Sequence, residues 1–258
     1  MKDSKVGIFI KTCRKDHEWL RYCLLSLRKN TEGFQGICLV TDSDHEEANE
    51  FSGEDIEIKF EKSPEINHKC QDGVGYLWMQ NIKLNWNKYC DYDAVLQLDS
   101  DCVVHSFLCP HFYRKDKKWK WWVRDWSISE LAIVHKKPLA KLLGKDSLYE
   151  HMPYPGWIME RTTTEDFHRW IKEKHGCDWW QYLVDKTADD WGNEIDEPDL
   201  KGTSRGSSIY NAYGGFVESN RSKYIFIEGF NDPPPIRQHW SHGGIDEKTR
   251  TKLEDLLN

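Results

Sequence analysis

The sequence DAVLQLDSDCVV, residues 93–104, shows most directly how this chain folds. Its apolar run up to Leu98 predicts a buried strand. Asp99 and Asp101 follow at once, and a second apolar run begins at Cys102. In open α/β sheets, ligands bind beyond the carboxyl ends of the strands. The stretch therefore predicts a strand that carries two carboxylates to the ligand-binding edge of a sheet.

The region before this stretch has a strand–helix–strand pattern. Apolar runs at 6–11 and 36–40 predict two more strands, and a third is expected over 56–60, where apolar residues alternate with charged ones. These strands end in polar residues. Apolar residues at helical spacing predict a helix after Asp16, and another helix is expected over 76–89. This order is typical of a mostly parallel sheet covered by helices, so we expect an α/β fold.

Polar residues end three of the predicted strands and should lie at one edge of the sheet. They are Thr12, Asp42 and the group Asp99, Ser100 and Asp101. Mg²⁺ and Mn²⁺ prefer oxygen ligands, and a site with one or two carboxylates leaves room for substrate phosphates. A metal held there would neutralise a diphosphate. The alternative, a solvated acidic turn, fits poorly with such apolar flanks.

The second half of the chain is less regular. Its expected elements are a strand over 119–125, helices over 136–143, from 162 onward and over 246–257, a Pro-rich loop over 151–156 and a mobile loop over 194–206. The chain has no internal repeat, low-complexity segment or clear linker. We therefore expect a single domain over residues 1–258.

The motif and its strand order resemble the GT-A superfamily of nucleotide-sugar glycosyltransferases, and more loosely its small bacterial and viral members. The resemblance covers about the first 110 residues. It implies a Rossmann-like, nucleotide-sugar-binding half over about 1–110 and a more irregular acceptor half over about 111–258. It also implies Mn²⁺- or Mg²⁺-dependent transfer of a hexose or pentose from a nucleoside-diphosphate sugar to a hydroxyl acceptor such as a glycan.

The resemblance assigns roles to the strand-end residues. The last carboxylate of the motif, Asp101, would bind the metal directly, whereas Asp99 would contact the ribose or reach the metal through water. Ser100 would lie beside the donor. The base and ribose of the donor would meet Thr12 and Asp42.

Three further residues are candidates for donor binding. Arg14 can either approach the diphosphate or cap the turn in which it lies. Gln80 and Lys83 are one helical turn apart and can point toward the donor phosphate or sugar. The alternative for both is a solvated helix face.

A C-terminal histidine often completes the metal site in the superfamily. The segment 237–244 offers His239 and His242, and imidazole is an acceptable Mn²⁺ ligand. We favour His242 because Gly243 and Gly244 follow it, and glycines let the backbone approach a diphosphate closely.

Aromatic residues in two segments can bind an acceptor sugar. Tyr154 and Trp157 belong to a rigid Pro-rich loop, and Tyr210 and Tyr213 stand beside glycines that can line the same cleft.

An inverting transferase also needs a carboxylate base near the acceptor hydroxyl. Asp125 ends a predicted strand, and Glu218 is a further candidate. Glu165 and Asp166 can serve as the base or merely favour a helix N-terminus.

The composition excludes several other classes. The net charge of −7 argues against a nucleic-acid partner, which needs a basic face. No apolar run approaches membrane-spanning length. Eight cysteines without a C-x-x-C pair predict reduced, mostly buried thiols and a cytoplasmic protein. Thirteen tryptophans suit either core packing or stacking on a sugar.

Two other functions are compatible with parts of the sequence. A sugar-phosphate nucleotidyltransferase shares the α/β sheet and the carboxylates, but it usually has a Gly-rich loop where this chain has Thr12 to Asp16. A noncatalytic carbohydrate-binding protein would use the tryptophans, but such modules are usually all-β.

Overall fold

The computed structural model describes residues 4–42, 45–65, 74–130, 132–191, 208–219, 221–229, 233–239 and 244–257. The strands are β1 (Val6–Lys11), β2 (Ile37–Thr41), β3 (Ile56–Phe60), β4 (Ala94–Asp99), β5 (Cys102–Val104), β6 (Arg114–Lys115), β7 (Lys118–Asp125), β8 (Tyr149–Glu150), β9 (Trp157–Glu160), β10 (Tyr224–Glu228) and β11 (Ile236–Gln238). The helices are α1 (His17–Asn30), α2 (His45–Ala48), α3 (Val74–Leu84), α4 (Ala132–Leu143), α5 (Arg161–His175), α6 (Trp179–Trp191), α7 (Ile209–Ser219) and α8 (Glu247–Leu257).

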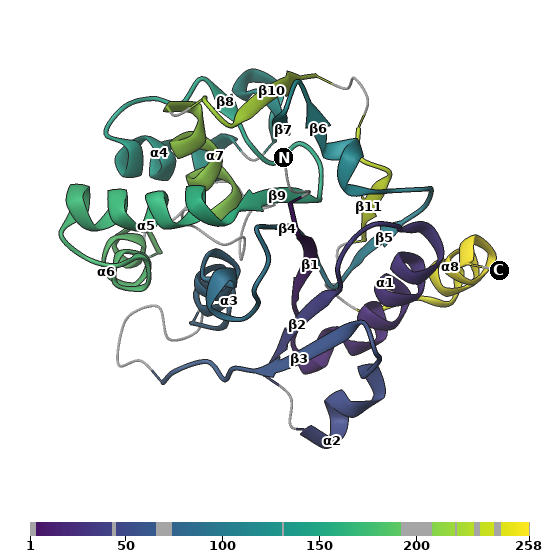
Figure 1. Cartoon of the computed structure of the whole chain (residues 1–258). Coiled ribbons are helices and arrows are strands. Elements are labelled where there is room, and N and C mark those ends of the chain that lie inside the picture. The colour runs from purple at the N-terminus through teal and green to yellow at the C-terminus, as the bar shows by residue number, and fades with distance from the viewer. Residues whose placement is uncertain are drawn as a thin grey trace.

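The central sheet has five strands among the described residues, in the order β3-β2-β1-β4-β9. All neighbours run parallel except β9, which is antiparallel to β4. Helices α1 and α8 lie on one side of this sheet and α3 on the other (Figure 1). The predicted α/β fold with a mostly parallel sheet is confirmed.

Strand β1 lies at the centre of the sheet, and all six of its residues are buried. Burying side chains such as Ile8, Phe9 and Ile10 contributes roughly 1.5–3 kcal/mol each. The pairing register places Lys11, the last residue of β1, beside Asp99, the last residue of β4. The hydrophobic core thus fixes the position of the strand ends.

Helix α1 confirms the predicted helix after Asp16. Its predicted apolar stripe of Leu20, Cys23, Leu24 and Leu27 is buried against the sheet. Asp16 occupies the N-cap position, but its side chain makes no capping hydrogen bond.

The helix expected over 76–89 runs instead from Val74 to Leu84. A short 3₁₀ helix, Trp86–Lys88, follows it. The Asn85 amide donates to the Asn81 carbonyl at 2.8 Å, and such side-chain bonding competes with regular helix hydrogen bonds.

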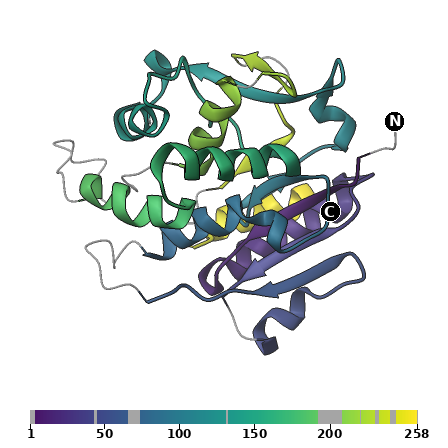
Figure 2. The same ribbon diagram turned by 60° about the vertical axis from the view of Figure 1, so that its left-hand side comes forward.

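A second sheet belongs to the later part of the chain. Strand β7 pairs with β10, β6 and β8, and both views place these strands beyond β9, away from β3 (Figures 1 and 2). A separate antiparallel pair joins β5 to β11, so residues 236–238 run beside the strand that follows Asp101.

The segment Tyr210 to Phe216 lies in the buried helix α7. Its glycines allow close packing. A Cβ on Gly214 would lie 2.4 Å from the His151 ring, and one on Gly215 would lie 2.8 Å from Leu143. The mobile loop predicted over 194–206 falls outside the described residues.

The described cysteines differ in burial. Cys23, Cys38, Cys90 and Cys102 are buried, and the remaining described ones are half-buried. None of the helices in the described ranges combines the length and the apolar character that crossing a membrane would require.

Candidate functional site

A group of polar side chains gathers at the carboxyl ends of β1, β2 and β4. Thr12 follows β1 directly, Asp42 follows β2, Asp99 is the last residue of β4, and Asp101 directly precedes β5. The Thr12 amide donates to the Val40 carbonyl at 2.9 Å, which ties the end of β1 to β2. The predicted edge therefore exists, and Asp101, at 6 % exposure, is one of its buried residues.

Asp99 is the centre of the contacts at this edge. One of its oxygens, Oδ1, accepts a hydrogen bond from the Lys83 ammonium and lies 3.5 Å from the Tyr210 hydroxyl. Lys83 is buried, with 1 % of its side chain exposed, and its ammonium also lies 5.2 Å from the centre of the Tyr210 ring. A buried ammonium needs a counter-charge, and Asp99 supplies it.

The Gln238 carboxamide joins the two carboxylates. Its Nε2 donates to Asp99 Oδ2 at 3.1 Å and to Asp101 Oδ1 at 3.2 Å. Strand β11 holds Gln238 opposite Cys102, and the His239 amide donates to the Asp101 carbonyl at 2.8 Å. The motif is therefore clamped by a segment from the far end of the chain.

Lys11 is a second buried cation at this edge. Its ammonium donates to the Thr12 carbonyl, and burial lowers its pKa below the usual value, while Asp42 acts in the opposite sense. The Lys83 ammonium reaches the same edge from α3, so two lysines and the two motif aspartates meet at the ends of β1 and β4.

The predicted donor-binding residues have different surroundings. Lys83 reaches the motif, whereas the Gln80 side chain accepts from the Ile209 amide at 2.7 Å and anchors the start of α7.

Arg14 is exposed and pairs with Glu47 at 2.5 Å, although its backbone amide donates to Asp42 at 3.3 Å. Ser100 is buried within the motif turn.

Of the two predicted histidine ligands, only His239 is described. Its ring stacks on Trp19 with centroids 5.5 Å apart, and burial lowers its pKa. His242 and Gly243 lie outside the described residues. Gly244 is described and has a φ of +81°, in the left-handed region that favours glycine. Within the described ranges, no group of three or more His, Cys, Asp or Glu residues is arranged to hold a metal ion.

The predicted acceptor aromatics are mostly buried. Trp157 and Tyr210 stack with ring centroids 3.5 Å apart, and Tyr210 connects this pair to Asp99. Tyr213 lies in the core, stacked on Trp121. Tyr154 is half-buried, and burial raises its pKa.

The four candidate bases make contacts away from the motif. Asp125 is exposed, and hydrogen bonding with the Ser127 side chain and with the Ser127 amide, which donates at 2.7 Å, lowers its pKa. Glu165 and Asp166 are exposed on α5, where Asp166 pairs with Arg169 at 3.0 Å.

Glu218 differs from the other three because its side chain is nearly buried, at 7 % exposure. Burial alone would raise its pKa, but hydrogen bonds with His151, Ser147 and the Leu148 amide lower it below the usual value. The Ser147 hydroxyl donates at 2.8 Å, and His151 Nε2 lies at 3.3 Å. This network gives Glu218 a structural role between α7 and the loop before β8.

Most tryptophans belong to the core. Among those whose side chains are described, none is exposed, and the half-buried ones are Trp78, Trp170 and Trp180. The described tryptophans therefore form no exposed sugar-binding platform.

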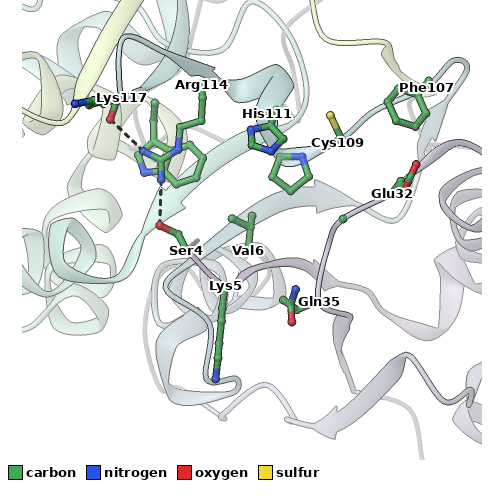
Figure 3. A pocket seen from close by; sticks show the side chains of 13 residues that line it. Ser4, Lys5, Val6, Glu32, Gln35, Phe107, Cys109, His111, Arg114 and Lys117 are labelled. Atoms are coloured by element: carbon green, nitrogen blue, oxygen red, sulfur yellow. Dashed lines mark hydrogen bonds between the residues drawn. The ribbon is translucent and has the colours of Figure 1, made fainter. Parts of the chain in front are cut away.

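A cavity of about 730 Å³ lies at the opposite, amino end of the sheet (Figure 3). It is lined by Val6, His111 and Arg114, among others. The Arg114 guanidinium lies 3.1 Å over the Trp119 ring and is bonded to Ser4 and to the Lys117 carbonyl. The Lys5 side chain points away from Arg114 (Figure 3). Because its charged groups do not converge, this cavity lacks the chemistry found at the carboxyl ends.

Sequence reasoning missed two residues of the site, Lys11 and Gln238. Lys11 is the polar end of an otherwise apolar strand, a signal shared with Asp99. Gln238 immediately precedes His239, but its contact with Asp101 spans 137 positions, and the local sequence carries no sign of it.

Comparison with known proteins adds no family to this description. No family model matches the chain, and no curated protein matches it significantly.

Proposed function

We propose that this chain is a metal-dependent glycosyltransferase with a GT-A type fold. It would transfer a sugar from a nucleoside-diphosphate sugar to a hydroxyl acceptor such as a glycan. The observation that supports this most is the convergence of Asp99 and Asp101 at the carboxyl end of β4, beside the ends of β1 and β2. Ligands of open α/β sheets bind at this edge.

The residues at this edge suit a diphosphate donor. Asp99 and Asp101 would hold Mn²⁺ or Mg²⁺, since both ions prefer oxygen ligands and accept phosphate oxygens beside carboxylates. When bound, the ion would stabilise the negative charge of the leaving diphosphate. Lys83, already at Asp99, would add a positive charge beside the same group.

Transfer requires that the acceptor oxygen bonds to the anomeric carbon of the sugar while the bond from that carbon to the diphosphate oxygen breaks. The acceptor proton passes to a base. Thr12 and Asp42 would flank the nucleoside at the ends of β1 and β2, and the Tyr210 ring would form the floor beside Asp99.

The structure makes the alternatives less attractive. A carbohydrate-binding protein that uses tryptophans would need them exposed, but the described ones are buried or half-buried. A nucleotidyltransferase would need phosphate-binding glycines after β1, whereas residues 12–16 contain none.

A panel of nucleotide sugars, each incubated with the protein and Mn²⁺, tests the proposal. We expect slow release of free sugar and nucleoside diphosphate from one donor, lost in Asp101→Asn and retained in the exposed control Asp93→Asn. Absence of hydrolysis and transfer with every donor would contradict it. Formation of pyrophosphate from a nucleoside triphosphate and a sugar phosphate would establish the nucleotidyltransferase instead.

A further inference from the structure

One oxygen of Asp99 and one oxygen of Asp101 share a neighbour, the Gln238 carboxamide. Asp99 Oδ1 accepts from Lys83, and the other oxygen of Asp99, Oδ2, accepts from Gln238. Gln238 Nε2 lies 3.1 Å from the first and 3.2 Å from the second. The end of this side chain therefore stands next to the point at which a cation would bind both carboxylates.

The distances fit a small octahedral cation. With bonds of 2.0–2.1 Å, as for Mg²⁺, adjacent octahedral ligands are separated by about 2.9–3.0 Å, and Mn²⁺ requires slightly more. For Ca²⁺, with bonds of 2.3–2.6 Å, the same separation would be about 3.3–3.7 Å. Gln238 Nε2 is therefore about as far from each of the two carboxylate oxygens as one ligand of a Mg²⁺- or Mn²⁺-sized site is from the next.

For Gln238 to bind a cation, its carboxamide oxygen must take the place of the nitrogen that now points at the carboxylates. A glutamine carboxamide carries a donor NH₂ and an acceptor oxygen of similar shape. Its last torsion is broad, so a half-turn exchanges the two atoms. The backbone does not need to move, because β11 is paired with β5 and the His239 amide is bonded to Asp101.

We propose that Gln238 is a protein ligand of the metal, through Oε1, together with Asp99 and Asp101. Without the cation, its NH₂ group donates to both carboxylates and keeps their oxygens directed at one point. When the cation binds, the carboxamide turns and presents its oxygen. This inference rests on the metal site of the proposed function and supplies that site with a third ligand from the described residues.

A competing role for Gln238 makes the opposite prediction. If the amide only fills the space of the cation, it must be displaced, and removing it would strengthen metal binding. If Oε1 is a ligand, removing it weakens binding. The sign of the change distinguishes the two roles.

The experiment measures Mn²⁺ binding to the whole protein by electron paramagnetic resonance, without nucleotide or acceptor. We expect Gln238→Met, which keeps the length of the side chain but lacks the oxygen, to raise the Kd about tenfold. Gln238→Glu, which keeps an oxygen there, should bind Mn²⁺ at least as tightly as the wild type. Gln35→Ala, which removes an exposed amide at the other end of the sheet, is the matched control and should leave the Kd unchanged.

Unchanged or tighter Mn²⁺ binding by Gln238→Met would overturn the proposal. Circular dichroism checks that each variant is folded, and Gln238→Ala repeats the test if the methionine variant is not. Asp101→Asn separates the two claims. If Asp101→Asn abolishes Mn²⁺ binding and Gln238→Met does not weaken it, the ligand role of Gln238 fails while the metal site of the proposed function stands. If the wild type binds no Mn²⁺ without nucleotide, the ligand role of Gln238 fails, and the proposed function also fails if no Mn²⁺ binds when a nucleoside diphosphate is added.

Discussion

The two ends of the central sheet have very different chemistry. At the carboxyl ends, Lys11, Lys83 and Asp101 are all buried, and Asp99 is paired with Lys83 and Gln238. At the amino ends lies a cavity of about 730 Å³ whose charged groups are exposed or engaged separately. Burying charge is costly unless it is paired, so the first arrangement needs a compensating network and the second does not. On the function that we propose, convergent buried charge, rather than enclosed volume, marks the ligand-binding end of this sheet.

Aspartates stand at both ends of β4: Asp93 comes just before the strand, and Asp99 is its last residue. Replacing each one tests the difference in buried charge between the two ends of the sheet. Asp99→Asn should lower the free energy of unfolding by about 3–5 kcal/mol, because it leaves the buried Lys83 without its counter-charge. Asp93, which accepts from the Lys5 amide at 2.8 Å, is exposed, so Asp93→Asn should cost about 1 kcal/mol or less. Urea unfolding of both variants measures the difference, and equal losses would contradict the comparison.

Lys11 and Lys5 provide a smaller test at the two ends of β1. Because burial lowers the pKa of Lys11, between that lowered pKa and 10.5 the unfolded chain holds more protons than the folded one. Stability should therefore rise with pH in that window. Lys11→Met should remove this rise and should increase the free energy of unfolding by about 1 kcal/mol at pH 7.

The control for this test is Lys5→Met, which replaces an exposed lysine just before the same strand. It should change the free energy of unfolding by no more than about 0.5 kcal/mol at any pH tested. Urea unfolding between pH 7 and pH 10 gives both results. A lower free energy of unfolding for Lys11→Met would contradict the prediction, because it would mean that interactions in the folded state offset the cost of burying the Lys11 ammonium.

The smallest effect is expected at the cavity. Phe107 lines it with 63 % of its surface exposed, so Phe107→Ser should change stability by no more than about 0.5 kcal/mol. The KM for the donor found in the nucleotide-sugar panel should also stay the same. A large rise in KM, measured in the same hydrolysis assay, would mean that the amino end takes part in donor binding.

Local sequence patterns predicted the first half of the fold well. Strands β1 and β3 have the predicted bounds, because the apolar run of the first and the alternating apolar residues of the second both end at polar residues. Helix α3 ends at Leu84, before the predicted end. The Asn85 side chain bonds back to Asn81 just beyond this point, a contact that hydrophobic spacing does not reveal.

The second half depended on contacts between distant segments. The antiparallel strand β9 and the pairing of β11 with β5 have weak local signals, so the role of Gln238 was not apparent. The glycines beside Tyr213 suggested a cleft, but they serve the packing of α7 on His151 and Leu143. Thr12, Asp42, Asp99, Asp101 and Lys83 were predictable from the sequence, whereas Gln238, which joins the two carboxylates from the far end of the chain, was not.

Calorimetry of nucleoside diphosphate binding tests the central claim most directly. The donor identified in the nucleotide-sugar panel determines which diphosphate is used. We expect the nucleoside diphosphate to bind the wild type only when Mn²⁺ or Mg²⁺ is present. Asp101→Asn should lose this binding, and Asp93→Asn should retain it. Equal binding with and without the metal, or undiminished binding by Asp101→Asn, would contradict it.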